Sequence, residues 1–424
     1  MGHTITLVLI ERSFYTALDR RDWPLVASGT ALIGASYGLA RYAYGLYLPT
    51  LRGEFGLQAS TAGLVASLSY GSYLLALVAG AALCERGRAR LAAVLAGAAA
   101  ALGTAAVALA GSATVLGIGV AIGGASTGLS SPAMVALIAA RVRPRHRDRA
   151  QTVVNAGTGV GILVSAPSAL AATAHWRAAF ALFAALSLAV TVAIGATSAT
   201  AADARPAMPL PPGGRGRSAR RPPQGSLPLV VGALGLGAAA SAYWTFGRDL
   251  LAAAGATDSA GPTLWMALGA ASIVAAVTGD LVARYRAGPV WAALLACLAA
   301  GTTGLALAPR SLALGLASAI LFGASFVALT GVLIVWAARL EPQRPATAVS
   351  GAFILLSIGG LAGAALTGAV VDRAGYSPAF LLAAGIALAC TPLAYTPAAR
   401  SALACAPSSS AWSSGSSEAS SRAR

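Results

Sequence analysis

The sequence predicts an all-α integral membrane protein in which twelve transmembrane helices form two repeats of six. Three observations support this fold class. Hydrophobic residues make up 57% of the 424 residues and charged residues only 10%, whereas a soluble protein carries about 25% charged residues. Long apolar stretches recur along the whole chain, and the few charges fall in the gaps between them. Most of the surface must therefore face lipid.

Each predicted span is a long apolar segment, because a helix that crosses the hydrocarbon core needs about 20 such residues. The segments are rich in Ala, Leu and Gly and lack the alternating pattern of a membrane β-barrel. The twelve predicted spans are 25–48, 60–83, 89–110, 112–140, 149–173, 176–200, 227–251, 260–284, 288–308, 310–338, 346–371 and 376–397.

The arginines predict how these spans are oriented. All 29 basic residues are Arg. If the N-terminus is inside, 23 of them lie on the inner side and four lie on the outer side, namely Arg52, Arg177, Arg310 and Arg373. Basic loop residues concentrate on the cytoplasmic side. We therefore expect a multi-pass plasma-membrane protein with both termini in the cytoplasm.

The gaps between spans divide the chain into five parts. The longest interior gap is rich in Pro, Gly and Arg, a composition that prevents a stable helix and is typical of a linker. The Ser-rich C-terminal segment has the composition of a disordered tail. The predicted parts are a cytoplasmic tail at 1–24, a six-helix bundle at 25–200, a cytoplasmic linker at 201–226, a second bundle at 227–397 and a tail at 398–424.

The two bundles echo each other at a shift of about 200 residues. The segment Ala40–Gly45 falls on Ala242–Gly247, and Trp176 and Phe180 fall on Tyr376 and Phe380. Gly80 falls on Gly279, and Pro144 on Pro342. Two six-helix repeats of this kind place a solute path near the membrane midplane, between the halves.

The loop after the second span carries a further motif, Gly80-Ala-Ala-Leu-Cys84-Glu85-Arg86-Gly87-Arg88. With this motif and the repeat, the chain resembles the major facilitator superfamily over roughly residues 25–397. That family has G-x-x-x-D-R-x-G-R-[RK] in this loop. Gly80, Gly87 and Arg88 match it, and Glu85 with Arg86 would supply the acid–base pair one residue late.

The resemblance implies a secondary transporter, and not an enzyme, that moves a small solute by alternating access. It also implies that the loop forms a charge latch on the cytoplasmic side, with a second copy after the eighth span. The expected gating residues are Gly80, Glu85, Arg86, Gly87, Arg88, Asp280 and Arg284.

Arg41 is the main candidate for binding the solute. It lies 16 positions after Leu25, about 24 Å along a helix, in the outer half of the predicted span. Tyr42 and Tyr44 are its neighbours in the sequence. An arginine at the membrane centre costs about 3 kcal/mol on insertion scales, which favours a functional role. The alternative is an arginine that snorkels to the outer headgroups.

Three further residues are candidates for solute binding. Tyr243 and Trp244 lie in span seven, the repeat mate of span one, and could stack on a solute or anchor the span at the membrane interface. Asn155 in span five could hydrogen-bond a ligand or a neighbouring helix.

Asp249 is the candidate for carrying a coupling proton, because intramembrane carboxylates are few. It could instead form an interfacial ion pair with Arg248, or pair with Arg41.

Several functions are disfavoured by the sequence. Four cysteines without a CxxC pair, together with three histidines, favour neither a metal site nor a disulfide framework. Without any Lys, a P-loop for ATP is impossible in its usual form. The arginines lie in short gaps and do not form a nucleic-acid-binding face. We therefore expect no cofactor, no metal and no nucleic-acid partner.

The expected partners are the lipid bilayer, a small organic solute and protons, and we expect a monomer. Proton-coupled efflux is the predicted activity. Uptake of a small organic metabolite, which could be anionic, is the alternative, and a non-transporting sensor or intramembrane enzyme is a remote one.

The arginine distribution generates a test of topology. Reporter fusions at Gly213 and Ser408 should be active only with a reporter that works in the cytoplasm. A signal from a periplasmic reporter at either position would contradict the predicted orientation.

Overall fold

The computed structural model describes residues 18–171, 175–199, 226–277, 287–341, 345–397 and 399. Every regular element in these ranges is a helix, as predicted. Ten of the helices are long and apolar enough to cross a membrane. The segmented first span and the shorter helix that begins at Ala260 complete the twelve.

The first span is longer than the predicted 25–48. It runs without a break through α2 (Trp23–Ile33), a π-helical stretch η1 (Gly34–Tyr42) and α3 (Ala43–Phe55). The remaining elements of the N-terminal half are α4 (Ala59–Glu85), α5 (Ala89–Ala108), α6 (Ala113–Arg141), η2 (Pro144–His146), α7 (Arg147–Ala171) and α8 (Trp176–Thr197).

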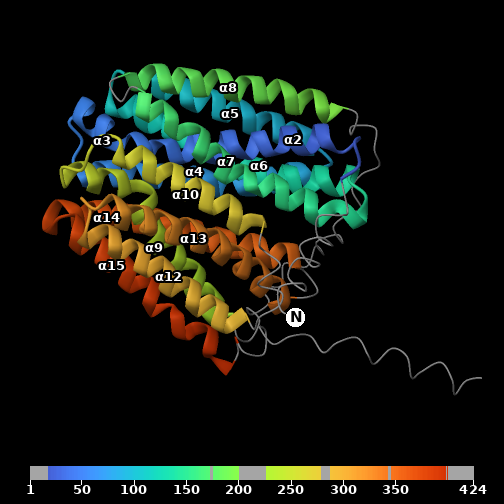
Figure 1. Ribbon diagram of the computed structural model, residues 1–424. Helices are drawn as coiled ribbons and strands as arrows, with labels where there is room; N and C mark the ends of the chain where they lie inside the picture. The colour runs from blue at the N-terminus through green and yellow to red at the C-terminus, as the bar shows by residue number, and fades with distance from the viewer. Residues whose placement is uncertain are drawn as a thin grey trace, which may run out of the picture.

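The C-terminal half repeats this arrangement (Figure 1). Its elements are α9 (Leu227–Ala253), α10 (Ala260–Val277), α12 (Ala287–Leu307), α13 (Leu312–Leu340), α14 (Pro345–Ala374), α15 (Tyr376–Ala389) and η5 (Thr391–Tyr395). The last part of the predicted span 260–284 lies outside the described residues, and the predicted span 376–397 consists of α15 followed by the 3-10 helix η5.

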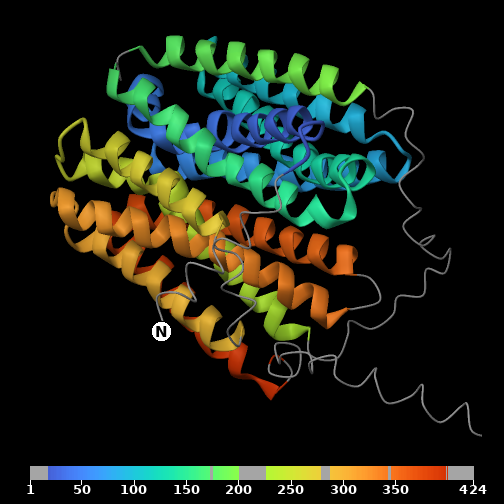
Figure 2. The same ribbon diagram turned by 45° about the vertical axis from the view of Figure 1, so that its right-hand side comes forward.

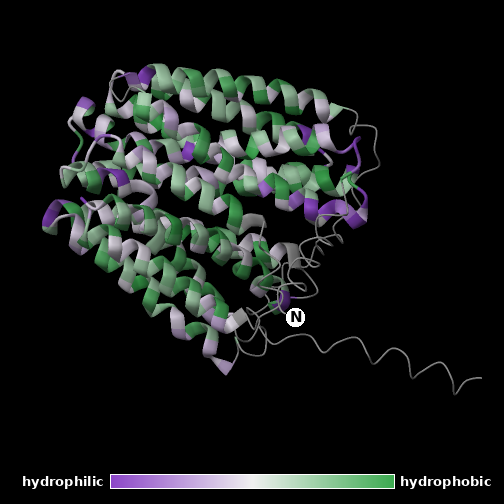
Figure 3. Cartoon of the chain, in the orientation of Figure 1, coloured by the Kyte–Doolittle hydropathy of each residue, from purple (hydrophilic) through white to green (hydrophobic). Residues whose placement is uncertain are grey.

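The helices run between two polar ends of the molecule (Figure 3). We call the end where α2 and α9 begin the linker end, and the end that holds Phe55 and Ala253 the distal end. Hydrophilic residues gather at both ends, and the stretch between them is mostly hydrophobic (Figure 3). This distribution suits a bilayer whose hydrocarbon core covers the middle of the bundle.

Glycines allow the first and fifth spans to touch through their backbones. A Cβ atom on Gly38 would lie 2.1 Å from the carbonyl carbon of Gly161, and one on Gly157 would lie 2.3 Å from the Thr30 oxygen. Lipid provides no hydrophobic drive for helix association, so small residues that permit close packing stabilise such contacts.

The two halves meet along three helix pairs, α3 with α9, α4 with α14 and α7 with α10. Glycines line these contacts as well. A Cβ on Gly63 would lie 2.4 Å from the Ala364 oxygen, and one on Gly159 would lie 2.6 Å from the Gly269 oxygen. The halves lie together at the distal end and diverge toward the linker end (Figures 1 and 2).

The glycine contacts generate a stability prediction. In Gly161→Ala, the new methyl group would lie 2.1 Å from the Gly34 carbonyl oxygen, so this variant should lose about 1–3 kcal/mol. The matched control is Gly385→Ala, because that position has no atom within 4 Å and an alanine favours a helix by about 0.5–1 kcal/mol. Melting curves in detergent measure both, and equal melting temperatures would contradict the packing argument.

Candidate functional site

Arg41 lies in the last turn of the π-helical stretch of the first span. π-helical turns are rare and frequently accompany functional sites. The half-buried guanidinium carbon lies 4.4 Å from the ring centre of Tyr70 and 4.8 Å from that of Tyr73, both on α4. Its Nη1 donates to the Thr127 hydroxyl on α6 over 3.4 Å. We call Arg41, Tyr70, Tyr73 and Thr127 the Arg41 site.

The observed helix places Arg41 closer to the middle of its span than the predicted bounds 25–48 did. Eighteen residues separate it from Trp23 and fourteen, about 21 Å, from Phe55, so it lies just on the distal side of the midpoint. Its neighbours belong to two other spans of the N-terminal half, α4 and α6. This placement favours the interior position over snorkelling to headgroups.

Tyr42 and Trp244 stack on each other across the two halves. Their ring centroids are 4.1 Å apart and the planes differ by 15°. These residues occupy equivalent positions of the two repeats, at a shift of 202 residues. The rings of Trp265, Phe322 and Phe326 contact Trp244 edge-on at 5.4–6.0 Å. The predicted solute-binding pair therefore lies at the boundary between the halves.

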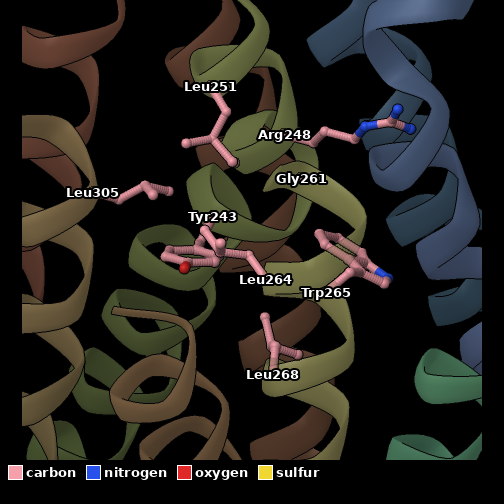
Figure 4. Close-up of a pocket in the computed structure, with 9 residues that line it drawn as sticks. Tyr243, Arg248, Leu251, Gly261, Leu264, Trp265, Leu268 and Leu305 are labelled. Atoms are coloured by element: carbon pink, nitrogen blue, oxygen red, sulfur yellow. The ribbon is translucent and has the colours of Figure 1, made fainter. Parts of the chain in front are cut away.

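Two indole N–H groups in this aromatic cluster have no acceptor among the described residues. They belong to Trp244 and Trp265, which are 4% and 3% exposed. A cavity of about 10 Å³, roughly the space of one water, adjoins Trp265, Tyr243 and Arg248. In Figure 4 the side chains of Arg248 and Trp265 both extend from the C-terminal half toward the N-terminal helices.

Asp249 is paired with Arg52 at the distal end. The Arg52 Nη1 lies 2.5 Å from the Asp249 Oδ2, and the Tyr376 hydroxyl donates to the same oxygen. The side chain of Asp249 is 6% exposed and that of Arg52 is 23% exposed. We call Arg52, Asp249 and Tyr376 the distal lock, because Arg52 belongs to one half and the other two residues to the other.

Two further polar contacts join the halves near the distal lock. Arg248, which is 7% exposed, donates through Nη1 to the carbonyl oxygen of Leu46. Asp372 at the end of α14 accepts from the amides of Ala59 and Ser60 at 2.9 and 2.8 Å. A carboxylate at a helix N-terminus satisfies free amides and complements the helix dipole, so Asp372 caps α4 from the opposite half.

Three predicted solute-binding residues lie apart from the Arg41 site. The Tyr44 hydroxyl donates to the Ala62 carbonyl within the N-terminal half. Tyr243 bonds Ser318 at 2.9 Å and stacks on Phe322 within the C-terminal half. Asn155 is exposed and accepts from Gln151 one turn earlier.

The predicted gating residues separate into three groups. Gly80 is buried against Leu129 and Pro132 of α6, so a Cβ there would lie 3.0 Å from the Pro132 ring. The turn from Glu85 to Arg88 is exposed, and Gly87 has a φ of +73° that favours glycine. Within that turn the side chain of Arg86 donates to the Ala82 carbonyl. Asp280 and Arg284 lie outside the described residues.

One group of side chains at the linker end has the residue types of a metal site. The ligand atoms of Asp19, Asp22 and His146 lie within 4.8 Å of one another. Two arginines already occupy part of this group, because Arg143 pairs with Asp19 at 3.0 Å and Arg145 donates to the His146 Nε2. These cationic neighbours disfavour a bound cation.

Sequence reasoning did not single out four residues of this region. Tyr70 and Tyr73 are spaced as neighbours on one helix face, a pattern that could have indicated an aromatic partner for Arg41. In the sequence, Arg52 was assigned only to the outer loops, and Tyr376 was noted only as the repeat match of Trp176. Their pairing with Asp249 depends on the closure of the two halves, which a single sequence does not display.

The distal lock generates a test of its contribution to closure. Spin labels at Gln58→Cys and Thr257→Cys, two exposed distal positions of opposite halves, report the distance between the halves when the native cysteines are replaced. Asp249→Asn and Arg52→Gln should each weaken closure by about 2 kcal/mol, less than the 3–5 kcal/mol of a fully buried pair. The distance distribution should shift to longer values.

The matched control for this test is Arg177→Gln. Arg177 pairs with Glu54 at 2.9 Å, also at the distal end, but both residues are exposed and belong to the same half. Its distance distribution should remain that of the unchanged protein. Equal distributions in Asp249→Asn and Arg177→Gln would show that the distal lock does not hold the halves together.

Comparisons with known proteins agree with this arrangement. The model of the Major Facilitator Superfamily matches residues 30–357. No curated protein matches the sequence significantly. Among solved structures, a nucleoside transporter, NupG, has a TM-score of 0.68 at 12% identity, with 88% of this chain and 97% of that chain covered.

Two further solved structures share the fold. A peptide transporter, POT, has a TM-score of 0.70 at 15% identity, with 92% of this chain and 97% of that chain covered. A bacterial homologue of the human lysosomal transporter Spinster, in an inward-facing and occupied conformation, has a TM-score of 0.61 at 15% identity and covers 89% and 94%. Because the family model spans most of the sequence, this chain belongs to the major facilitator superfamily, whose members of this kind are secondary transporters.

Proposed function

We propose that the protein exports a small organic solute by alternating access, coupled to protons that move inward. The observation that carries the proposal is the position of the Arg41 site and of the Tyr42–Trp244 stack midway along the bundle. The linker end is the proposed cytoplasmic side, in agreement with the arginine distribution. A solute would then reach Arg41 from the cytoplasm while the distal lock closes the outer side.

Asp249 is the proposed proton carrier. While the distal lock is closed, its carboxylate pairs with Arg52 and accepts from the Tyr376 hydroxyl. When the halves separate at the distal end, Arg52 withdraws and Asp249 faces the outer solution, where it can take up a proton. Renewed pairing with Arg52 displaces that proton, which in this proposal leaves along the boundary between the halves toward the linker end.

The proposed solute-binding residues are chosen from the same geometry. Arg41, Tyr42 and Trp244 are the proposed solute-binding residues, because they meet where the two halves adjoin. Tyr44 and Tyr243 support them by fixing α3 on α4 and α9 on α13. Asn155, exposed on α7, is the proposed contact for a solute that enters from the cytoplasm.

The proposal is tested in proteoliposomes with a radiolabelled compound chosen because it raises the melting temperature of the purified protein. An imposed pH gradient should drive accumulation of the compound against its concentration gradient. Asp249→Asn should abolish this accumulation and leave exchange of labelled for unlabelled compound intact. Arg177→Gln should behave as the unchanged protein.

The outcomes separate coupling from transport. Unchanged gradient-driven accumulation in Asp249→Asn would remove this residue from the coupling mechanism. Accumulation that requires the opposite gradient would establish uptake in place of efflux. No movement of any stabilising compound would overturn the transport proposal itself.

A further inference from the structure

Arg41 keeps its charge in the membrane interior without a carboxylate partner. Among the described residues, no Asp or Glu lies within 4.0 Å of its guanidinium, whereas Arg52, Arg143 and Arg177 each have one. The faces of Tyr70 and Tyr73, at 4.4 and 4.8 Å, attract the cation through their ring quadrupoles. They carry no negative charge, so the positive charge in the membrane interior remains uncompensated.

The hydrogen bonds of Arg41 reach no anionic acceptor. A guanidinium can only donate. Arg41 donates to the Thr127 hydroxyl over 3.4 Å and to the Tyr70 hydroxyl, and both acceptors are neutral oxygens. The indole N–H of Trp244, whose ring stacks on Tyr42, has no acceptor among the described residues. A ligand with a carboxylate would supply the anionic acceptor that Arg41 lacks.

Arg248 adds a second positive charge without a carboxylate partner at the boundary between the halves. Arg248 bonds a carbonyl oxygen, and no carboxylate among the described residues lies within 4.0 Å of it. Asp258, in the outer loop, acts on it only from a longer distance. Asp249 lies between these two arginines and the distal end, and its charge is balanced by Arg52. The boundary between the halves is therefore electropositive.

The walls beside these donors are flat and apolar. Tyr42 and Trp244 stack face to face, and Phe322 and Phe326 lie parallel to each other at 6.1 Å. Offset stacking on such faces contributes about 0.5–1.5 kcal/mol beyond the buried area. A ligand with an aromatic ring could replace the contact between Tyr42 and Trp244 without leaving either ring exposed.

We infer that the solute is a small aromatic anion, in which a carboxylate or similar acidic group binds Arg41 and a flat ring stacks on Tyr42 or Trp244. This inference rests on the proposed function, because it names the chemical class of the solute. A cationic amine would meet repulsion from Arg41. A neutral amide would not neutralise the guanidinium.

Quenching of tryptophan fluorescence tests whether the Arg41 site attracts anions. Iodide, caesium and acrylamide are an anionic, a cationic and a neutral quencher of similar size. The Trp244 contribution is the difference between the unchanged protein and Trp244→Phe, a variant that retains a ring opposite Tyr42. Iodide should quench this contribution at least tenfold more efficiently than caesium. In Arg41→Gln the preference should disappear while quenching by acrylamide persists, and a cooperative melting transition of this variant shows that it is folded.

Matched ligands test the ring and the charge together. Benzoate and 2-naphthoate should raise the melting temperature of the purified protein, whereas the corresponding amides and aminomethyl compounds should not. Affinity for the carboxylates should fall at least tenfold in Arg41→Gln and only partly recover in Arg41→Lys, because an ammonium lacks the planar pair of donors. Acetate should give no shift, because it has no ring.

The results distinguish this inference from the transport proposal. Equal quenching by iodide and caesium, or equal stabilisation by amides and carboxylates, would overturn the aromatic anion and leave transport standing. No stabilisation by either carboxylate would overturn it as well. Selective carboxylate binding without movement of benzoate or 2-naphthoate across proteoliposomes would support the anion site and refute transport.

Discussion

Contact between helix backbones at glycine positions is the constraint on which this fold depends. Lipid tails are as apolar as leucine side chains, so helices associate through close packing and not through the hydrophobic effect. Within the N-terminal half, Gly38 and Gly161 bring two spans together, and between the halves Gly45 brings the first span against the Trp244 carbonyl. Such contacts contain no interlocking side chains. Two surfaces of this kind can separate without leaving unpaired backbone groups, because those groups are bonded inside each helix.

Polar contacts determine where such separation is resisted. Arg52, Asp249, Arg248 and Asp372 make their contacts between the halves at the distal end, where the helices lie closest. Arg41 differs from them, because its partners are aromatic faces of its own half. Arg52 and Arg248 thus join the halves at the distal end, whereas the contacts of Arg41 with Tyr70, Tyr73 and Thr127 stay within its own half.

The fold was predictable because lipid imposes a simple rule on composition. Three features could be read directly along the sequence, without knowledge of which residues meet in space. They are the lengths of the apolar segments, the unequal distribution of arginines between the two sides, and the repeat. The first helix continues past residue 48 to Phe55, through a turn containing Arg52 that looked like a loop, so Arg41 lies nearer the midpoint of its span than the predicted bounds implied. The partner of Asp249 was missed because Arg52 is 197 residues away, and single sequences carry no information on such pairs. The repeat matched Tyr42 with Trp244, but their stacking depends on the state in which the halves meet.

The π-helical stretch connects the glycine contacts to the site. A π-helix has a wider turn than an α-helix, so residues after it face a direction that a 3.6-residue period does not predict. Gly34 and Gly38 lie within this stretch and press against Gly161 of α7. Arg41 and Tyr42 follow within one turn, so their directions depend on how the first span packs on the fifth. A shift of α7 relative to the first span would therefore turn Arg41 away from Tyr70 and Tyr73 and separate Tyr42 from Trp244. Packing inside one half thus influences the stacking of Tyr42 on Trp244, a contact that crosses to the other half.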